Sequence, residues 1–271
     1  MAEPVTTDMS TTAPGGGAPP IPEAVAAAIR ARAGDRLAPL VHRLFRSSLV
    51  LGPVTGGGET GGGERGEGRL GGLPALPAGT AWPAFSGRPM RFLAQLDCAR
   101  LAAAFRATGP GDRWPLPADG LLLFFHDEWL ADFSGRGCRV LHVPAGAPPR
   151  AAPPTEHGTP AVPAVPVRAS WALSAPSYQD RELENLFPDD FLVALDLALD
   201  LADQLPRPAV RVLGWCDTDT GRPEGHRPLL QIGSGALDTA RGACADVSFW
   251  ITDEDLAAGR FDLVRHGFET V

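Results

Sequence analysis

Hydrophobic and polar positions recur along the chain with two periods, which predict a mixture of helices and strands. The stretch 21–48 is predicted to be a helix that breaks near Gly34 and Asp35, because apolar residues recur every three to four positions from Ile21 to Phe45. Further helices are predicted at 98–105 and within 183–205. Short apolar runs predict strands at 91–97, 121–129, 139–144, 167–175, 228–232 and 246–251.

Two of the predicted helices begin at residues that favour helix starts. Asp97 precedes the helix at 98–105, where its carboxylate can accept a hydrogen bond from a free backbone N–H. Thr252 followed by Asp255 resembles a capping box, with Asp in place of the usual Glu, and predicts another short helix.

Composition divides the chain into three parts. Residues 1–20 are rich in Pro, Gly, Ala and Thr and are predicted to form a disordered tail. Residues 21–68 hold the first helix and a Gly-rich loop. Residues 69–271 are predicted to form an α+β domain with halves at about 69–145 and 165–271.

The two halves share an unusual feature, a glutamine inside an apolar strand. Gln95 lies in "FLAQLD" and Gln231, 136 residues later, lies in "PLLQIGS". Each strand is followed by an aromatic strand that carries Phe124 or Phe249. We interpret the pattern as an internal duplication, with chance similarity of apolar strands as the alternative. The predicted architecture is therefore α+β, with two related, mainly antiparallel sheets and short flanking helices.

Several motifs resemble the YwqG-like bacterial proteins, a family whose domain has no known function. They are "GGLPALPAGTAWPAFSGRPMRFLAQLDCARL", "LPADGLLLFFHDEW", "LLQIGSG" and "VSFWITDEDLAAGRFD", and they span roughly 69–265. The chain departs from the family where Gly233 and Gly235 replace two acids. It also lacks the family's Trp-Gly-Asp, having Arg241, Gly242 and Ala243 there. The resemblance implies a fold and brings no activity, and these departures put a cation-binding role at those positions in doubt.

Charge and hydropathy exclude two classes of partner. The net charge is -8, and the 24 basic residues are all arginines without a basic cluster, which argues against nucleic acid as a partner. No run of 18 apolar residues occurs, so no membrane-spanning helix is expected. The N-terminus lacks the pattern of a secretion signal, and we therefore expect a cytoplasmic protein.

The sequence predicts neither a metal site nor a cofactor. The four cysteines form no CxxC pair, and the six histidines show no HxH or HExxH spacing. Asp196, Asp200 and Asp203 share one helix face, which is typical of a solvated acidic surface. The Gly-rich loop has no Gly-Lys-Ser/Thr ending and is expected to be a flexible connector.

No catalytic residue is predicted either. The chain contains no Gly-x-Ser-x-Gly motif. Cys98 begins a helix, where a thiolate would be favoured, but a buried thiol is the preferred interpretation. His126 lies beside Asp127 and Glu128 and is interpreted as a strand end turning into solvent, with an acid–base cluster of the three residues as the alternative.

Six residues are candidates for binding a ligand or organising a loop. A buried amide needs hydrogen-bond partners, so each glutamine is expected to bond the backbone of a nearby loop, such as Gly71–Pro77. The alternative is that the two amides face a shared cleft and bind a ligand. Asp97 and Ser234 would act locally, on a helix start and on a turn. The candidates are Gln95, Asp97, Gln231, Ser234, Trp82 and Trp129.

These observations favour a binding or interaction module without catalytic activity. Its partner would be another protein, as for a regulator or an immunity-type protein. The alternative is a protein that binds a small molecule, or an enzyme, with a site in the cleft between the two halves.

Overall fold

The computed structural model describes most of the chain outside its N-terminus and several loops. The predicted disordered tail, most of the Gly-rich loop and Trp129 lie outside the described residues. The described residues are 20–54, 66–108, 113–127, 135–150, 163–217, 222–236 and 245–270.

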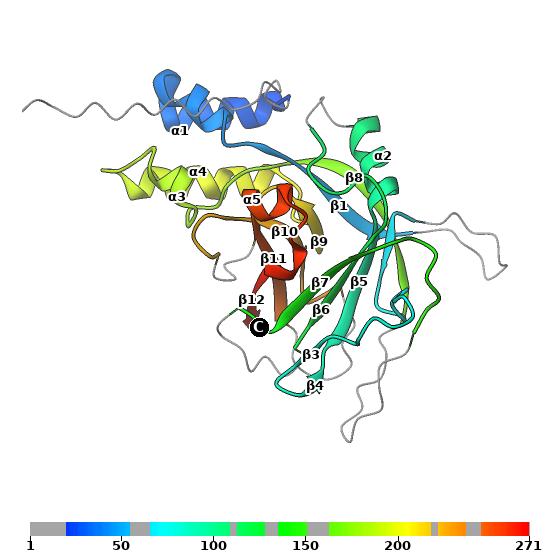
Figure 1. Ribbon diagram of the computed structural model, residues 1–271. Helices are drawn as coiled ribbons and strands as arrows, with labels where there is room; N and C mark the ends of the chain where they lie inside the picture. Colours follow the sequence, from blue (N-terminus) through cyan, green and yellow to red (C-terminus); the bar gives the residue numbers. More distant parts are fainter. Residues whose placement is uncertain are drawn as a thin grey trace, which may run out of the picture.

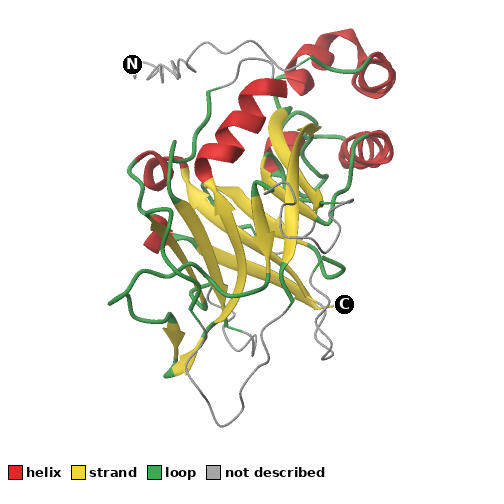
Figure 2. Cartoon of the chain, turned by 90° about the vertical axis from the view of Figure 1, so that its right-hand side faces the viewer, coloured by secondary structure: helices red, strands yellow, loops and turns green. Residues whose placement is uncertain are grey.

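Ribbon views show a strongly curved sheet with most of the helices around its upper end (Figures 1 and 2). None of the helices in the described ranges is long and apolar enough to cross a membrane. The elements are α1 (Glu23–His42), β1 (Arg46–Pro53), β2 (Gly68–Leu70), β3 (Ala84–Phe85), β4 (Arg88–Pro89), β5 (Arg91–Asp97), α2 (Cys98–Thr108), β6 (Leu121–His126), β7 (Cys138–Val143), β8 (Val165–Ser174), α3 (Arg181–Glu184), α4 (Phe191–Gln204), β9 (Val210–Leu213), β10 (His226–Ile232), β11 (Ala245–Thr252), α5 (Asp253–Ala257), a 3-10 turn (Phe261–Leu263) and β12 (Arg265–Thr270).

Ten of the strands form one antiparallel sheet, and β3 and β4 form a separate small hairpin. The order in the large sheet is β12-β11-β10-β9-β1-β8-β2-β5-β6-β7. The α+β class is confirmed, but the prediction of two related sheets is wrong. The physical reason is that β8 is paired on both sides. β8 pairs with β2 of the first half, and β1 pairs with β8 along its whole length and with β9 on its other side, so the strands of both halves form one sheet. The sequence did not predict β1 and placed residues 46–48 in the first helix.

The two edges of this sheet approach each other. The Cys138 thiol on β7 donates a hydrogen bond to the carbonyl of Val264 at 3.4 Å. The backbone N–H of His266 on β12 donates to the carbonyl of Gly135 at 3.0 Å. The sheet is therefore close to a barrel, and its inner residues from both halves form one core.

Helices α1 and α4 pack against each other outside the sheet. Gly34 has φ 66° and interrupts α1, as the sequence predicts. The acidic face of α4 is not entirely solvated, because Arg32 of α1 pairs with Asp196 at 2.9 Å and with Asp200 at 2.7 Å. The exposed ion pairs help to orient the two helices and add little stability.

The local register repeats around the two glutamines. A β-bulge lies two residues before Gln95 on β5, and another lies two residues before Gln231 on β10. The residue before each glutamine lies opposite an aromatic residue, Phe124 on β6 and Phe249 on β11. These two rings meet in the shared core with centroids 5.1 Å apart. The strand pairs are thus arranged alike within one sheet.

Candidate functional site

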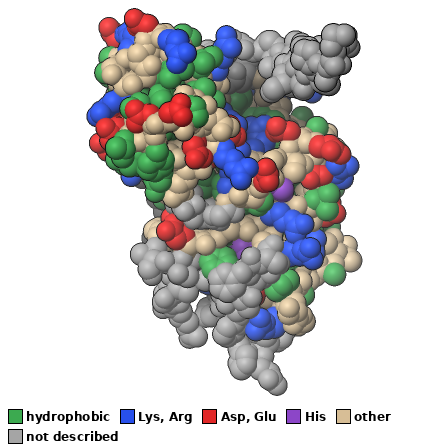
Figure 3. All heavy atoms as spheres, turned by 90° about the vertical axis from the view of Figure 1, so that its left-hand side faces the viewer, with side chains coloured by type: hydrophobic (Ala, Val, Ile, Leu, Met, Phe, Trp, Pro, Cys, Tyr) green, Lys and Arg blue, Asp and Glu red, His purple; other side chains and the backbone are tan. Residues whose placement is uncertain are grey.

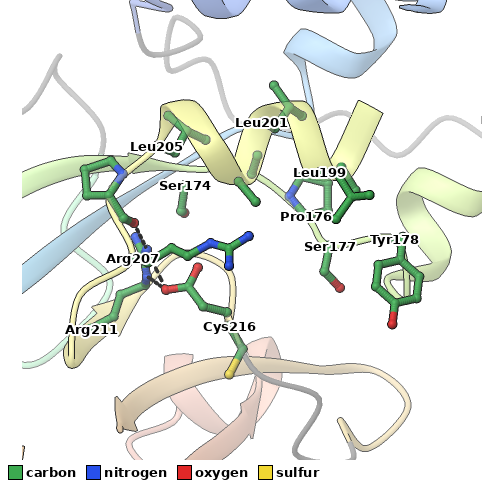
Figure 4. A pocket seen from close by; sticks show the side chains of 15 residues that line it. Ser174, Pro176, Ser177, Tyr178, Leu199, Leu201, Leu205, Arg207, Arg211 and Cys216 are labelled. Carbon is green, nitrogen blue, oxygen red and sulfur yellow. Dashed lines mark hydrogen bonds and ion pairs between the residues drawn. The ribbon is translucent and has the colours of Figure 1, made fainter. Parts of the chain in front are cut away.

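A cavity of about 280 Å³ lies between α4 and the sheet, and we call it the α4 pocket (Figure 4). Its lining residues fall between 174 and 217, so the pocket belongs to the second half. It differs in this from the cleft between halves that the sequence suggested. The lining residues are Ser174, Ala175, Pro176, Ser177, Tyr178, Ala198, Leu199, Leu201, Ala202, Leu205, Pro206, Arg207, Arg211, Cys216 and Asp217.

Helix α4 supplies the apolar wall of this pocket. The helix starts at Asp190, whose carboxylate accepts a hydrogen bond from the N–H of Val193 at 3.3 Å. One face of α4 is buried against α1 and the sheet, and the neighbouring face lines the pocket. Figure 4 shows the side chains of Leu199, Leu201 and Leu205 along the helix above the cavity.

The opposite end of the pocket is polar and centres on Arg211 of β9, which is only 2% exposed. Its Nε and Nη2 donate to Oδ2 of Asp217 at 3.3 and 2.8 Å. Nη2 also donates to the carbonyl of Pro206 at 2.7 Å, and Nη1 donates to the hydroxyl of Ser48 at 3.0 Å. The guanidinium is therefore paired and well supplied with acceptors, which is what makes its burial tolerable.

Asp217 is the acidic group of the pocket, and its side chain is 24% exposed. Burial raises the pKa of this carboxyl, while Arg211 and Arg207 act in the opposite direction. Gln231 fixes the position of Asp217, because its side-chain oxygen accepts a hydrogen bond from the Asp217 N–H at 2.9 Å. One sequence candidate thus supports the polar end of the pocket from behind.

Arg207 is the second arginine of the pocket and is exposed. Its guanidinium extends into the pocket in Figure 4, and its charge acts on the Asp217 carboxyl. Among the described residues no hydrogen bond or ion pair involves this guanidinium. Arg207 is therefore available to an anionic group in the pocket.

Gln95 lies outside the α4 pocket and holds a loop of the first half. Its side-chain oxygen accepts hydrogen bonds from the N–H of Ala75 at 2.9 Å and from Nη2 of Arg69 at 3.0 Å. Arg69 also donates to the carbonyl of Leu73. The loop is the Gly71–Pro77 segment that the sequence suggested as a partner.

The remaining candidates act on their own surroundings. Asp97 accepts a hydrogen bond from the N–H of Arg100 at 3.0 Å and so caps α2. Ser234 donates its backbone N–H to Oδ1 of Asp246 at 2.6 Å. The indole N–H of Trp82 donates to the carbonyl of Met90 at 2.9 Å. The structure does not bring these three residues to the α4 pocket.

His126 is buried, which contradicts its interpretation as a strand end turning into solvent. It is 5% exposed, and its ring lies edge-on to that of His266 with centroids 5.5 Å apart. Neither ring nitrogen of His126 has a hydrogen-bond partner among the described residues. Burial, together with His266 and Arg91, lowers the pKa of His126 to about 3.

Cys216 is the thiol that lines the pocket, and it shares a hydrogen bond with Ser248 at 3.0 Å. Among the described residues that line the pocket, no histidine lies beside this thiol as a base would. Burial raises the pKa of Cys98 to about 12, which makes that thiol unreactive. Within the described ranges, no three His, Cys, Asp or Glu side chains gather as metal ligands would.

Sequence reasoning missed Arg211 and its counterpart Arg69, although a signal was present. Each arginine lies opposite a glutamine on the neighbouring strand, and each is followed three positions later by a glycine, in "RLGG" and in "RVLG". Each arginine lies far from its glutamine in the sequence. Only the pairing of β2 with β5 and of β9 with β10 places the arginine opposite the glutamine.

The comparisons with known proteins identify the family and no activity. Residues 68–269 match the model of a domain of unknown function (DUF1963), and the chain belongs to this family. A search of curated proteins gave no match to the chain.

Proposed function

We propose that this protein binds a small amphipathic molecule in the α4 pocket. The proposal rests on one observation, that a single cavity has an apolar end and a charged end. Leucines of α4 line the apolar end, and Arg207, Arg211 and Asp217 line the charged end. Ligand sites in proteins combine an apolar lining with a few placed polar groups in this way.

The size of the pocket limits the ligand. Its volume of about 280 Å³ is at the low end of ligand pockets, which run from about 300 to 1,000 Å³. The proposal is therefore for a metabolite-sized molecule rather than for a large cofactor.

Filling the pocket provides the test. In Ala202→Phe, the new ring would occupy the cavity from α4, where Ala202 lines it. We expect a metabolite library to contain compounds that raise the melting temperature of the wild-type protein and not that of Ala202→Phe. Arg30→Gln, an exposed change on α1, serves as the control and should respond as the wild type does. Equal responses of the wild type and Ala202→Phe would reject the pocket as the binding site.

A second candidate function, binding to another protein, is supported by the surface of α4. Phe191 is 52% exposed, Leu192 is 67% exposed and Leu199 is 50% exposed. Figure 3 shows hydrophobic side chains beside acidic ones on the face that carries α3 and α4. Large apolar side chains exposed together can mark an interaction surface.

The two candidates respond differently to one substitution. Leu192→Asp changes the exposed surface and leaves the lining of the pocket intact. Protein binding would be lost in this variant while the melting-temperature response to small molecules is kept. If the wild type and Leu192→Asp capture a protein equally well, the exposed surface of α4 is not its binding site.

A further inference from the structure

Two polar groups of the α4 pocket keep unused bonding capacity, and they carry opposite charges. Oδ2 of Asp217 accepts both hydrogen bonds from Arg211. Oδ1 of Asp217 has no hydrogen-bond donor among the described residues, and the Arg207 guanidinium has no acceptor there. Both residues line the pocket, and the charge of Arg207 acts on the Asp217 carboxyl, so the pocket offers a carboxylate oxygen and a guanidinium near each other.

The free oxygen of Asp217 favours a cationic group. Its carboxyl is partly removed from water, and burial already disfavours the ionised form. Arg211 divides its donors among Asp217, Pro206 and Ser48, so it does not serve Oδ1. An ammonium group at Oδ1 would supply the missing donors in a charge-assisted hydrogen bond.

Arg207 and the leucines define the other parts of such a ligand. A carboxylate can accept two parallel hydrogen bonds from a guanidinium, so Arg207 suits an anion close to the ammonium. Leu205, Leu201 and Leu199 follow one another along α4 and line the cavity (Figure 4). A branched hydrocarbon chain placed there would be removed from water.

We propose that the ligand of the α4 pocket is a zwitterion of the amino-acid type with an apolar side chain. Its ammonium binds Oδ1 of Asp217, its carboxylate binds Arg207, and its side chain lies against the leucines of α4. This inference rests on the proposed ligand-binding function and specifies the chemistry of the ligand. A fatty acid would leave the Asp217 oxygen unpaired, and a simple amine would leave Arg207 without an anion.

Three probes separate these possibilities by calorimetric titration of the full-length protein. L-leucine carries both charges, 3-methylbutylamine lacks the carboxylate, and 4-methylpentanoate lacks the ammonium. We expect L-leucine to bind at least tenfold more tightly than either of the other two. Binding of 3-methylbutylamine or 4-methylpentanoate within threefold of L-leucine would overturn the zwitterion while leaving the α4 pocket as a ligand site.

Two substitutions test which residue binds the carboxylate of the ligand and which binds its ammonium group. Arg207→Gln should reduce L-leucine binding at least tenfold and leave 3-methylbutylamine unchanged. Asp217→Asn should weaken both of these probes and leave 4-methylpentanoate unchanged or tighter. Asp203→Asn and Arg30→Gln are exposed changes of the same kinds outside the pocket, and we expect both to bind as the wild type does. An unchanged affinity for L-leucine in Arg207→Gln would overturn the proposal even if Asp217→Asn does not fold.

The experiments distinguish an error in the ligand chemistry from an error in the proposal that the α4 pocket binds a ligand. If none of the three probes binds at millimolar concentration while other library compounds stabilise the wild type and not Ala202→Phe, the zwitterion is wrong and the binding function stands. If no compound distinguishes the wild type from Ala202→Phe, both are wrong.

Discussion

Arg69 and Gln95 lie opposite each other in the first half of the sheet, and Arg211 and Gln231 do so in the second half. In both halves the glutamine oxygen accepts an N–H from the residue six positions after the arginine. That residue is an alanine in the first half and Asp217 in the second. The side chain six positions after the arginine is therefore what differs: with alanine the glutamine only holds a loop, and with Asp217 the same arrangement forms the charged end of a pocket.

The backbone conformation between each arginine and the residue that donates its N–H to the glutamine is also repeated. Gly71 and Gly72 have φ values of 62° and 73°, and Leu213 and Gly214 have values of 63° and 75°. A Cβ atom at Gly72 would lie 2.8 Å from that of Ala164, and one at Gly214 would lie 2.4 Å from the hydroxyl of Ser174. Glycine is therefore required at the second position of each turn, because the turn packs closely and has a left-handed conformation. Leu213 tolerates such a conformation while 2% exposed in the core.

Removal of the arginines should produce the largest difference between the halves. Arg211→Met leaves the Asp217 carboxylate without its partner and is expected to lower the unfolding free energy by about 3–5 kcal/mol. Arg69 has neutral acceptors only, Leu73 and Gln95, so Arg69→Met should cost about 1 kcal/mol. Urea denaturation measures both, with the exposed Arg36→Met as control. Equal losses at Arg69 and Arg211 would show that Asp217 makes no difference to its half.

The next largest expected effect is a dependence of stability on pH that arises from His126. His126 lies two residues after Phe124, and the equivalent residue in the second half, two residues after Phe249, is Ile251. The folded state keeps the His126 pKa at about 3, whereas an unfolded chain has the ordinary value of 6.5. Below pH 6.5 the unfolded chain therefore binds more protons, and stability falls as the pH falls toward 3.

The change His126→Ile should remove this dependence. Through His126 the wild type is expected to lose about 2 kcal/mol of unfolding free energy between pH 7 and pH 5. Urea denaturation at the two pH values should give a smaller loss in His126→Ile. If the pH dependence is the same in both proteins, His126 is not the buried neutral histidine described above.

The glutamines should give a smaller and unequal pair of effects. Gln231 is 3% exposed, and Gln231→Leu removes the acceptor of the Asp217 N–H, so we expect a loss of about 1–3 kcal/mol. Gln95 is less deeply buried, so water can replace part of its bonds, and Gln95→Leu should fall at the lower end of that range. Thermal unfolding of the wild type, Gln95→Leu and Gln231→Leu measures the two losses. A larger loss at Gln95 would reverse the expected order.

The smallest expected effect is the interaction gained when the first half is given a carboxylate at the position equivalent to Asp217. Ala75→Asp places a carboxylate six positions after Arg69, as Asp217 follows Arg211. Ala75 is 7% exposed, so burial of the new charge lowers the stability and offsets most of its attraction to Arg69, and the coupling between the two side chains should stay within about 1 kcal/mol. A double-mutant cycle with Arg69→Met isolates the interaction between the two side chains. Zero coupling would mean that the two turns do not place position 75 and position 217 alike.

The sequence could predict elements whose causes lie within a few residues. The strands β5, β6, β7, β8, β10 and β11 follow from apolar runs, and α2 and α5 begin at residues that the sequence identified as caps. It did not predict β1, because a short apolar run between a helix and a Gly-rich loop has no local signal that distinguishes it. It also placed His126 in solvent, since its burial depends on His266 from the far end of the chain.

By itself the sequence determined the helix and strand patterns, the recurrence of glutamine in two strands and the absence of recognisable catalytic and metal-binding motifs. Only the tertiary structure decided that the two halves share one sheet, that Arg211 pairs with Asp217 beside Arg207, and that α4 encloses a pocket over them. The physical reason is distance along the chain. Periodicity and capping depend on neighbouring residues, whereas strand partners and buried charges depend on segments that meet only after folding.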